Sequence, residues 1–344
     1  MPEVTLLNIG RTIEVPDGQT ILEAALAEGI DYPHGCKSGR CGSCKSRLSG
    51  GEVELIDHSR FALTPEDRDG GLILACRAVP KGPVSVVWLG DEDETDSHPL
   101  READAEVVGV ALLTHDILGL RLKVAGPALD FAPGQYATLA LPGVPARDYS
   151  MANATCAEEL EFHIRRVPGG QTSGAIHDRL RPGDRVRLTG PRGSAQLRFG
   201  HTGPILAVAG GSGLAPILSI LQSVVAQGMR QPIHVYFGGR DEYDLYGLER
   251  LTKLAEQHGD MTVTPVLSSP SAPTTRRVGL VHTAVRTDHD DLDGWKCYTA
   301  GPPVMIDALT EVVLAQGLQR GDLHADVFFT PETKTETVGL TAAG

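Results

Sequence analysis

The sequence predicts a multidomain protein of the α+β and α/β classes, with three folded modules in succession. At 344 residues the chain is too long for one ordinary domain. Residues 104–200 hold short alternating strands separated by Pro-Gly turns, the pattern of an antiparallel β-barrel. From residue 201 apolar strands alternate with helical stretches, which is typical of a parallel α/β sheet. Residues 1–90 form a smaller α+β module that contains a cluster of cysteines.

The composition is that of an ordinary globular protein, with 41% hydrophobic and 22% charged residues. A net charge of −13 argues against a nucleic-acid partner or an anionic membrane surface. The N-terminus lacks a basic region followed by an apolar run, and no segment offers the roughly 18 consecutive apolar residues of a membrane helix. We therefore expect a cytoplasmic protein without a membrane partner.

The N-terminal module begins with two short alternating strands, at 4–9 and 11–15, followed by a helix over 20–28. The helix is indicated by apolar residues that fall on one face, namely Ile21, Leu22, Ala25 and Leu26. Acidic residues then dominate, because 91–106 contains eight acids and one base. Such a run cannot pack in a core, so 91–103 is predicted to be an extended, solvated linker.

The two larger modules differ in their periodicity. Strands of the barrel, residues 104–200, are predicted at 106–112, 118–124, 136–141, 160–165 and 185–188. Strands of the α/β domain, residues 201–331, are predicted at 205–209, 233–237, 262–266 and 296–299, with helices at 214–227, 248–257 and 304–315. Residues 332–344 are left as a C-terminal tail.

Four of the six cysteines are spaced for metal binding. Cys36, Cys41, Cys44 and Cys76 follow the pattern C-x4-C-x2-C…C, the plant-type spacing of a [2Fe–2S] cluster. Intervening glycines let the loop curl so that backbone N–H groups point at sulfur. A structural zinc site is the alternative, but zinc modules favour paired C-x2-C units and this chain has one. Cys156 and Cys297 remain, and we expect them to be buried thiols.

A second motif lies on a predicted barrel strand and reads Arg147-Asp148-Tyr149-Ser150. Strand alternation sends Arg147 and Tyr149 to one face, where a guanidinium can neutralise a pyrophosphate and a phenol ring can cover a planar heterocycle. Further on, Gly169-Gly170 frees the N–H groups of Gln171 and Thr172 to form a second anion site. The alternative is a solvated strand face, which shows the same alternation.

A third motif, Gly210-Gly211-Ser212-Gly213, connects an apolar strand to a helix that has Pro216 in its first turn. This context is what phosphate binding at a helix N-terminus requires, although a plain turn is the alternative. A fourth motif, Gly301-Pro302-Pro303, ends a strand and begins a helix, so it can line a ligand crevice or serve as an ordinary helix start.

Taken in this order, the motifs resemble the reductase components of aromatic-ring-hydroxylating dioxygenases, among them those of naphthalene and terephthalate dioxygenases. Further segments that carry the resemblance are 134–139, 149–152, 201–204 and 323–328. The resemblance covers almost the whole chain. It implies a β-grasp ferredoxin domain of the plant type, an FAD-binding barrel and an NAD(P)H-binding α/β domain of the ferredoxin–NADP reductase superfamily.

The resemblance also assigns roles to residues. Arg147 and Ser173 would hold the FAD phosphates, Tyr149 would stack on the isoalloxazine ring, and Ser150 would hydrogen-bond near flavin N5. The wider cofactor-binding set comprises Met151, His163, Ile164, Arg165, Val167, Gly170, Gln171, Thr172, Gly210, Gly211, Ser212, Gly213, Arg240, Gly301, Pro302 and Phe328.

The chain departs from the family pattern at two positions. Gln171 stands where many relatives have Lys or Arg, and Ala300 stands where the family usually has a cysteine beside the nicotinamide. Cys297 lies three residues earlier on the same predicted strand, about 10 Å away and on the opposite face, so it cannot substitute for that cysteine. We expect hydride transfer to survive at a lower rate, because the cofactors supply the chemistry.

The implied activity is electron transfer from NAD(P)H through FAD and the cluster to an external acceptor. The implied partner is a Rieske oxygenase or a Rieske-type ferredoxin, bound transiently by a monomeric reductase. NADH is favoured, with partial tolerance of NADPH, because Asp241 and Glu242 outnumber Arg240 where the adenosine ribose should lie. Alternatives are reductases of P450 systems, multicomponent monooxygenases or deoxysugar dehydratases, and a non-enzymatic iron–sulfur carrier.

Overall fold

The computed structural model describes residues 1–34, 37, 39, 42–58, 62–89, 98–155 and 158–328. The chain divides into two compact units. One holds the N-terminal residues up to Thr95 together with the segment from Ala325, and the other runs from Asp96 to His324. Cys36, Cys41, Cys156, the linker residues 91–97 and the tail 332–344 lie outside the described residues. Among those described, no helix is long and apolar enough to cross a membrane.

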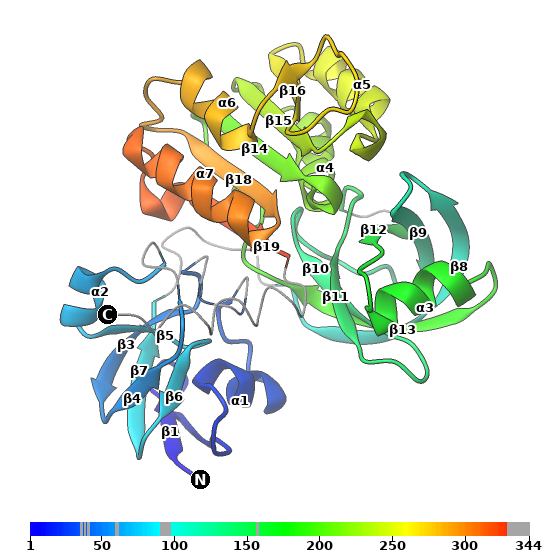
Figure 1. Ribbon diagram of the computed structural model, residues 1–344. Coiled ribbons are helices and arrows are strands. Elements are labelled where there is room, and N and C mark those ends of the chain that lie inside the picture. The colour runs from blue at the N-terminus through cyan, green and yellow to red at the C-terminus, as the bar shows by residue number, and fades with distance from the viewer. Residues whose placement is uncertain are drawn as a thin grey trace. The chain divides into compact units, whose positions relative to one another are not determined.

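The first unit is built on a mixed five-stranded sheet in the order β2-β1-β7-β3-β5 (Figure 1). Its strands are β1 (Glu3–Leu6), β2 (Arg11–Glu14), β3 (Lys45–Gly50), β5 (Leu72–Leu74) and β7 (Val84–Trp88). β1 pairs in parallel with β7 and antiparallel with β2. A two-stranded sheet joins β4 (Val53–Leu55) and β6 (Ala78–Pro80), and α2 spans Pro65–Asp69.

Helix α1 (Ile21–Ala27) covers this sheet and confirms the predicted helix. It begins after Thr20, whose hydroxyl accepts from the N–H of Glu23 while the Glu23 carboxylate accepts from the N–H of Thr20. Ile21 and Leu22 are fully buried in a core shared with Leu6 and Leu74. The mixed sheet with one packed helix is the predicted ferredoxin-type fold.

The second unit begins with a six-stranded antiparallel sheet in the order β11-β10-β13-β8-β9-β12. Its strands are β8 (Arg101–Leu112), β9 (Ile117–Val124), β10 (Tyr136–Ala140), β11 (Arg147–Ser150), β12 (Glu159–Arg165) and β13 (Arg185–Arg192), and α3 (Gln171–Arg179) follows β12. A bridge between Met151 and Phe162 joins the two edges, so the sheet is a nearly closed barrel. Its interior contains the fully buried side chains of Phe131, Leu120 and Ile164.

The end of the predicted linker differs from the structure. Arg101–Ala103 belong to β8, because their backbones pair with β13, where Arg101 lies opposite Gly190. The acidic residues Glu102 and Asp104 point outward on this strand and contact Arg187. The charge run therefore continues into a strand, since one face of an antiparallel sheet can remain solvated.

The second unit continues with a parallel sheet in the order β17-β16-β15-β14-β18-β19 (Figure 1). Its strands are β14 (Ile205–Gly210), β15 (Ile233–Gly239), β16 (Met261–Leu267), β17 (Arg277–Val278), β18 (Lys296–Gly301) and β19 (Leu323–Val327). The helices are α4 (Leu214–Ala226), α5 (Leu248–His258), α6 (Val281–Asp288) and α7 (Pro303–Ala315), with 3₁₀ turns at Gly211–Gly213, Glu242–Asp244 and Arg320–Asp322.

The strand order places a topological switch point between β14 and β18. The chain leaves β14 towards β15 on one side and later returns to β18 on the other side. Side chains of β14 alternate between two cores, since Ala207 packs in the core that contains α4 and Leu206 in the core that contains α6 and α7. In such sheets the crevice beyond the carboxyl ends of the strands at the switch point binds ligands. The four predicted strands and three predicted helices of this domain are confirmed.

Candidate functional site

The carboxyl ends of β14 and β18 approach each other closely at Gly213. A Cβ atom on Gly213 would lie 2.1 Å from the carbonyl oxygen of Ala300, so a side chain there would push the turn and the end of β18 apart. A Cβ on Gly210 would lie 2.6 Å from the sulfur of Met305, and one on Gly301, whose φ is +153°, would lie 2.8 Å from the methyl group of Met305. At these two positions the flexible Met305 side chain would have to move.

The turn after β14 provides backbone donors rather than side chains. Helix α4 begins directly after Gly213, and no side chain caps its N-terminus. The N–H groups of the first turn of a helix have no partner within the helix, and the helix dipole favours an anion there. Since the turn is close-packed and formed by glycines, it fits a pyrophosphate group that must approach the backbone. The structure thus brings Gly210, Gly211, Ser212, Gly213, Gly301 and Pro302 together, and their contact with a nucleotide stays a prediction.

The barrel contributes Arg165 to the same turn. A Cβ atom on Gly211 would lie 2.7 to 2.9 Å from three atoms of the Arg165 guanidinium group, which therefore covers this glycine. The Arg165 Nε lies 3.2 Å from the Asp116 carboxylate. The sequence predicted only that Arg165 binds a cofactor, and the structure places its side chain against the turn predicted to bind the nucleotide.

The predicted flavin strand, β11, lies at one edge of the barrel sheet. Arg147 and Asp148 are exposed, while Ser150 is buried. The Tyr149 ring packs against the barrel core, and burial raises the pKa of its hydroxyl despite the opposing charge of Arg147. The exposed guanidinium and the covered phenol ring lie near each other, which fits the predicted role of this strand.

The glycine loop before α3 forms the second predicted anion site. Gly169 has a φ of +69°, and a Cβ on Gly170 would lie 2.6 Å from the Ser173 hydroxyl. That hydroxyl accepts from the N–H of Val167 at 3.1 Å, and the Thr172 hydroxyl donates to the carbonyl of Pro145 at 2.6 Å.

Both hydroxyl groups therefore hold the shape of the loop. No side chain caps α3, so backbone N–H groups at the start of the helix, among them those of Gln171 and Thr172, are available as donors for the predicted anion site. A hollow of about 410 Å³ borders the loop and is lined by Asp116, Arg166, Val167, Pro168, Gly169, Gly170 and Gly174. The donor set fits a phosphate group.

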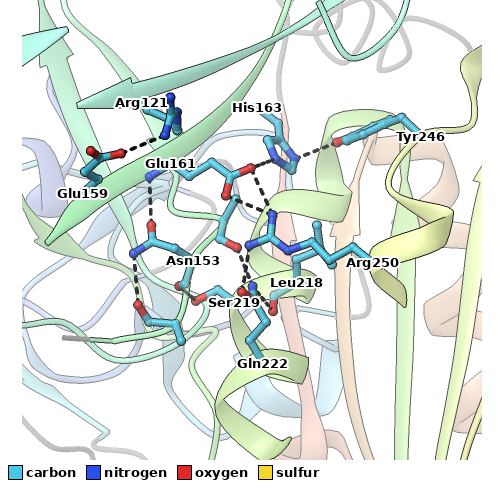
Figure 2. A network of polar contacts seen from close by, with 12 residues as sticks. Arg121, Asn153, Glu159, Glu161, His163, Leu218, Ser219, Gln222, Tyr246 and Arg250 are labelled. Carbon is cyan, nitrogen blue, oxygen red and sulfur yellow. Dashed lines mark hydrogen bonds and ion pairs between the residues drawn. The ribbon is translucent and has the colours of Figure 1, made fainter. Parts of the chain in front are cut away.

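His163 lies in a different environment from the one that the sequence suggested. Its Nδ1 is 2.9 Å from the Tyr246 hydroxyl and its Nε2 is 2.9 Å from the Glu161 carboxylate, so both ring nitrogens contact protein (Figure 2). Neither ring nitrogen of His163 is therefore left over for a cofactor. Tyr246 and Glu161 were not singled out in the sequence, although the alternation of 159–165 places Glu161, His163 and Arg165 on one face of a strand.

Two of the four cluster cysteines are described. Cys44 precedes β3 and Cys76 follows β5, both are buried, and the Cys76 N–H lies 3.5 Å from the Cys44 sulfur. Backbone donors to sulfur stabilise thiolate charge. In the same loop Gly39 has a φ of +75°, and a Cβ there would lie 2.7 Å from Arg77 and 2.8 Å from His58. This buried pair of thiols fits a metal cluster, while Cys36 and Cys41 lie outside the described residues.

The charged residues at the end of β15 are already engaged with other groups. Glu242 accepts from Thr274 and Arg276, each at 2.7 Å, and the buried Asp241 accepts from the N–H groups of Glu242 and Ser271. Arg240 keeps 67% of its side chain exposed and lies 3.5 Å from the Asp244 carboxylate. Neither acid is therefore an isolated negative charge.

The other residues that the sequence singled out are mostly buried. Ala300 and Cys297 pack in different cores, which confirms that they lie on opposite faces of β18. Burial raises the pKa of the Cys297 thiol, consistent with an inert side chain. Ile164 and Met151 are buried in the barrel core, and Phe328 is half-buried directly after β19. Cofactor contacts of these three residues stay predictions.

A ferredoxin-type unit, an antiparallel barrel and a parallel nucleotide sheet together define the class of flavin and iron–sulfur reductases that use NAD(P)H. Family models match each part. They are the 2Fe-2S iron-sulfur cluster binding domain over residues 4–81, the oxidoreductase FAD-binding domain over 104–197 and the oxidoreductase NAD-binding domain over 207–311.

Relatives with known functions match over almost their whole length. The reductase component of the naphthalene 1,2-dioxygenase/salicylate 5-hydroxylase systems of Ralstonia sp is 40% identical over 91% of this chain and 94% of that protein. The naphthalene 1,2-dioxygenase system reductase of Pseudomonas putida is 40% identical over 93% and 96%. The crystal structure of an Amycolatopsis cytochrome P450 reductase has 35% identity, covers 95% of this chain and 99% of its own, and gives a TM-score of 0.75.

The chain belongs to this family of oxygenase-system reductases. It is an NAD(P)H-dependent oxidoreductase that carries FAD and a [2Fe–2S] cluster. The predicted resemblance, fold class and cofactors are confirmed. The comparisons do not support the alternative of an iron–sulfur carrier without enzymatic activity, because both oxidoreductase domains match their models.

Proposed function

We propose that this chain transfers electrons from NADH through FAD and its [2Fe–2S] cluster to the oxygenase, or to the ferredoxin, of an aromatic-ring-hydroxylating dioxygenase system. The observation that carries the proposal is the glycine crevice between β14 and β18, which Arg165 of the barrel covers at Gly211. A nucleotide site and a flavin site are thereby joined in one compact unit. Its relatives from Ralstonia and Pseudomonas putida belong to naphthalene dioxygenase systems.

When bound, the nucleotide supplies a hydride, the flavin divides its two electrons into single ones and the cluster passes these on. The chain itself binds and orients. Arg147 and the N–H groups at Gly170–Ser173 would hold the FAD phosphates, Tyr149 would cover the flavin ring and Ser150 would lie near its reactive edge. The turn at Gly210–Gly213 would hold the nucleotide pyrophosphate. No side chain is needed as a general acid or base.

The proposed cluster ligands are Cys36, Cys41, Cys44 and Cys76. Cys44 and Cys76 support this assignment because they are buried side by side at the ends of neighbouring strands. Gly39 supports it because its left-handed backbone and its contacts with Arg77 and His58 leave no room for a side chain. Two irons that are held by thiolates need four such ligands.

NADH is the proposed donor because the two arginines near the proposed ribose site already form ion pairs with carboxylates. Arg276 donates to the Glu242 carboxylate at 2.7 Å, and Arg240 lies 3.5 Å from Asp244. A 2′-phosphate would have to break these pairs to gain a cation, whereas a ribose hydroxyl group would not. Steady-state kinetics with NADH and NADPH test this preference. A higher catalytic efficiency with NADPH would contradict it.

The acceptor that we propose is a Rieske oxygenase or a Rieske-type ferredoxin, contacted transiently by a monomeric, cytoplasmic reductase. Electron carriers typically use small interfaces, which allow rapid exchange of partners. A second candidate is a cytochrome P450, favoured by the TM-score of 0.75 to the Amycolatopsis P450 reductase. NADH-driven reduction of a Rieske oxygenase, a Rieske ferredoxin and a P450, measured side by side, separates the two. Turnover with the P450 alone would overturn the dioxygenase assignment.

A further inference from the structure

The side chains of β12 face two different structures. Leu160, Phe162 and Ile164 fill the barrel core. The alternate residues face the parallel sheet domain, where Glu161 contacts Arg250 of α5, His163 contacts Tyr246 just before α5, and Arg165 covers the glycine turn after β14. Because strand side chains alternate, one strand thus serves both the flavin barrel and the nucleotide domain.

Glu161 is the centre of the contact between barrel and helices (Figure 2). The Arg250 guanidinium of α5 donates from Nη1 to both Glu161 oxygens, at 2.9 and 3.1 Å, and from Nη2 to Gln222 of α4 at 2.7 Å. The Gln222 amide donates in turn to the carbonyl of Ala152 at 2.8 Å. Two helices of the nucleotide domain are therefore held to the barrel beside β12.

Tyr246 extends this network to the nucleotide turn. It is 7% exposed, its ring packs edge-on against those of His163 and Phe237, and its hydroxyl lies 2.9 Å from His163 Nδ1 and 3.4 Å from the carbonyl of Gly211. Gly211 opens the turn that is predicted to hold the pyrophosphate. It is contacted from β12 twice, directly by Arg165 and through Tyr246 by His163.

The hydrogen bonds of Glu161, His163 and Tyr246 depend on one another. Glu161 is ionised at neutral pH and only accepts, so His163 Nε2 carries a proton. The Tyr246 hydroxyl donates its single proton to the Gly211 carbonyl while its oxygen accepts from His163 Nδ1, an arrangement in which both ring nitrogens of His163 donate. The charged groups around this pair are Arg165, Glu161, Asp116 and Arg250.

We propose that Tyr246 is a positioning residue for the nucleotide, which ties the turn at Gly211 to β12 so that its N–H groups are preorganised for a pyrophosphate. The inference rests on the proposed use of this turn for NADH. A preformed site binds more tightly because less ordering is needed on binding. Tyr246 itself touches neither cofactor in this account and acts through Gly211.

The test is Tyr246→Phe in the FAD- and cluster-loaded protein, which removes the hydroxyl and keeps the ring. ADP-ribose, which carries the pyrophosphate without the nicotinamide, is the binding probe in calorimetry. Loss of one hydrogen bond predicts a Kd about 3- to 10-fold higher. The KM for NADH, with ferricyanide as acceptor, should rise by a similar factor while kcat changes little, because this contact is equal in ground and transition states.

Tyr236→Phe is the matched control. This tyrosine also belongs to the nucleotide domain, but it packs in the core with α6 and α7 and donates to Asp288 at 2.8 Å. The Tyr236→Phe variant should lose thermal stability without any weakening of ADP-ribose binding. If Tyr246→Phe does not fold, His163→Gln replaces it, with the same expected weakening. If Tyr246→Phe bound ADP-ribose with the Kd of the parent chain, or with the same Kd as Tyr236→Phe, the inference would be overturned. If the parent chain bound ADP-ribose but failed to oxidise NADH, the proposed function would be overturned instead.

Discussion

Gly213 and Ala300 lie so close together that the carbonyl oxygen of Ala300 occupies the space in which a side chain on residue 213 would begin. A Cβ there would be 2.1 Å from that oxygen. The contact joins the residue directly before α4 to the end of β18, and both lie at the switch point of the sheet. The shape of the nucleotide crevice thus depends on a residue without a side chain.

Gly213→Ala should therefore disrupt nucleotide binding, because the added methyl group must move either the turn or β18. We expect the KM for NADH to rise more than about 10-fold, as expected for a loss of two or more hydrogen bonds, while FAD stays bound. Gly321→Ala is the control, since a Cβ on Gly321 would meet nothing within 4 Å. Equal KM values for the two variants would contradict the assigned site.

Arg147→Ala should release much of the flavin. A charge-assisted hydrogen bond to phosphate contributes about 1.5 to 3 kcal/mol, so the Kd of FAD should rise roughly 10- to 100-fold. The measurement is the ratio of FAD to protein after gel filtration, with titration of the apoprotein. Arg187→Ala serves as the control, because Arg187 is also exposed and pairs with Glu102 and Asp104 away from β11. Released flavin that proves to be FMN would refute the FAD assignment.

Cys44→Ser and Cys76→Ser should each abolish the cluster absorbance and leave NADH-dependent reduction of FAD intact. Thiolates hold iron far better than hydroxyl groups, and the parent chain should contain about two irons and two sulfides. Cys297→Ser controls for the loss of a buried thiol elsewhere in the chain. Zinc without labile sulfide in the parent protein would disprove the cluster assignment.

Glu161 should stabilise the second unit in a pH-dependent way. Burial raises the pKa of its carboxyl group, but the hydrogen bond from His163 and the charge of Arg250 outweigh burial and lower the pKa from 4.5 to about 2. Because the folded-state pKa is depressed, this stabilisation is complete above pH 4.5 and is lost as the pH falls towards 2.

Thermal unfolding of the parent chain and of Glu161→Gln tests this linkage. At pH 7 the variant should unfold at a lower temperature, since a charged hydrogen-bonded group contributes about 1 to 3 kcal/mol. The difference between the two proteins should shrink below pH 4.5. Glu159→Gln is the control, because Glu159 lies on the same strand as Glu161 and forms only an exposed pair, with Arg121 of β9. A difference that does not depend on pH would contradict the prediction.

The sequence alone determined the order of the modules and most of their local structure. The cysteine spacing and the glycine turn at Gly210–Gly213 are recognisable because each depends on residues a few positions apart. Strand alternation, as within 159–165, assigns side chains to a face by the same kind of local rule. Only the tertiary structure decided what that face contacts.

His163 illustrates the difference. Its neighbours in the chain suggested a flavin contact, but its ring lies between Glu161 and Tyr246, and Tyr246 is 83 residues away in the sequence. In the same way, only the structure shows that β18 pairs with β14, although about 90 residues separate them in the sequence. It also shows that Asp241 accepts a hydrogen bond from Ser271 and that Glu242 accepts one from Arg276. Local patterns reflect the periodicity of helices and strands, whereas packing partners are selected by burial and charge pairing among residues far apart in the chain.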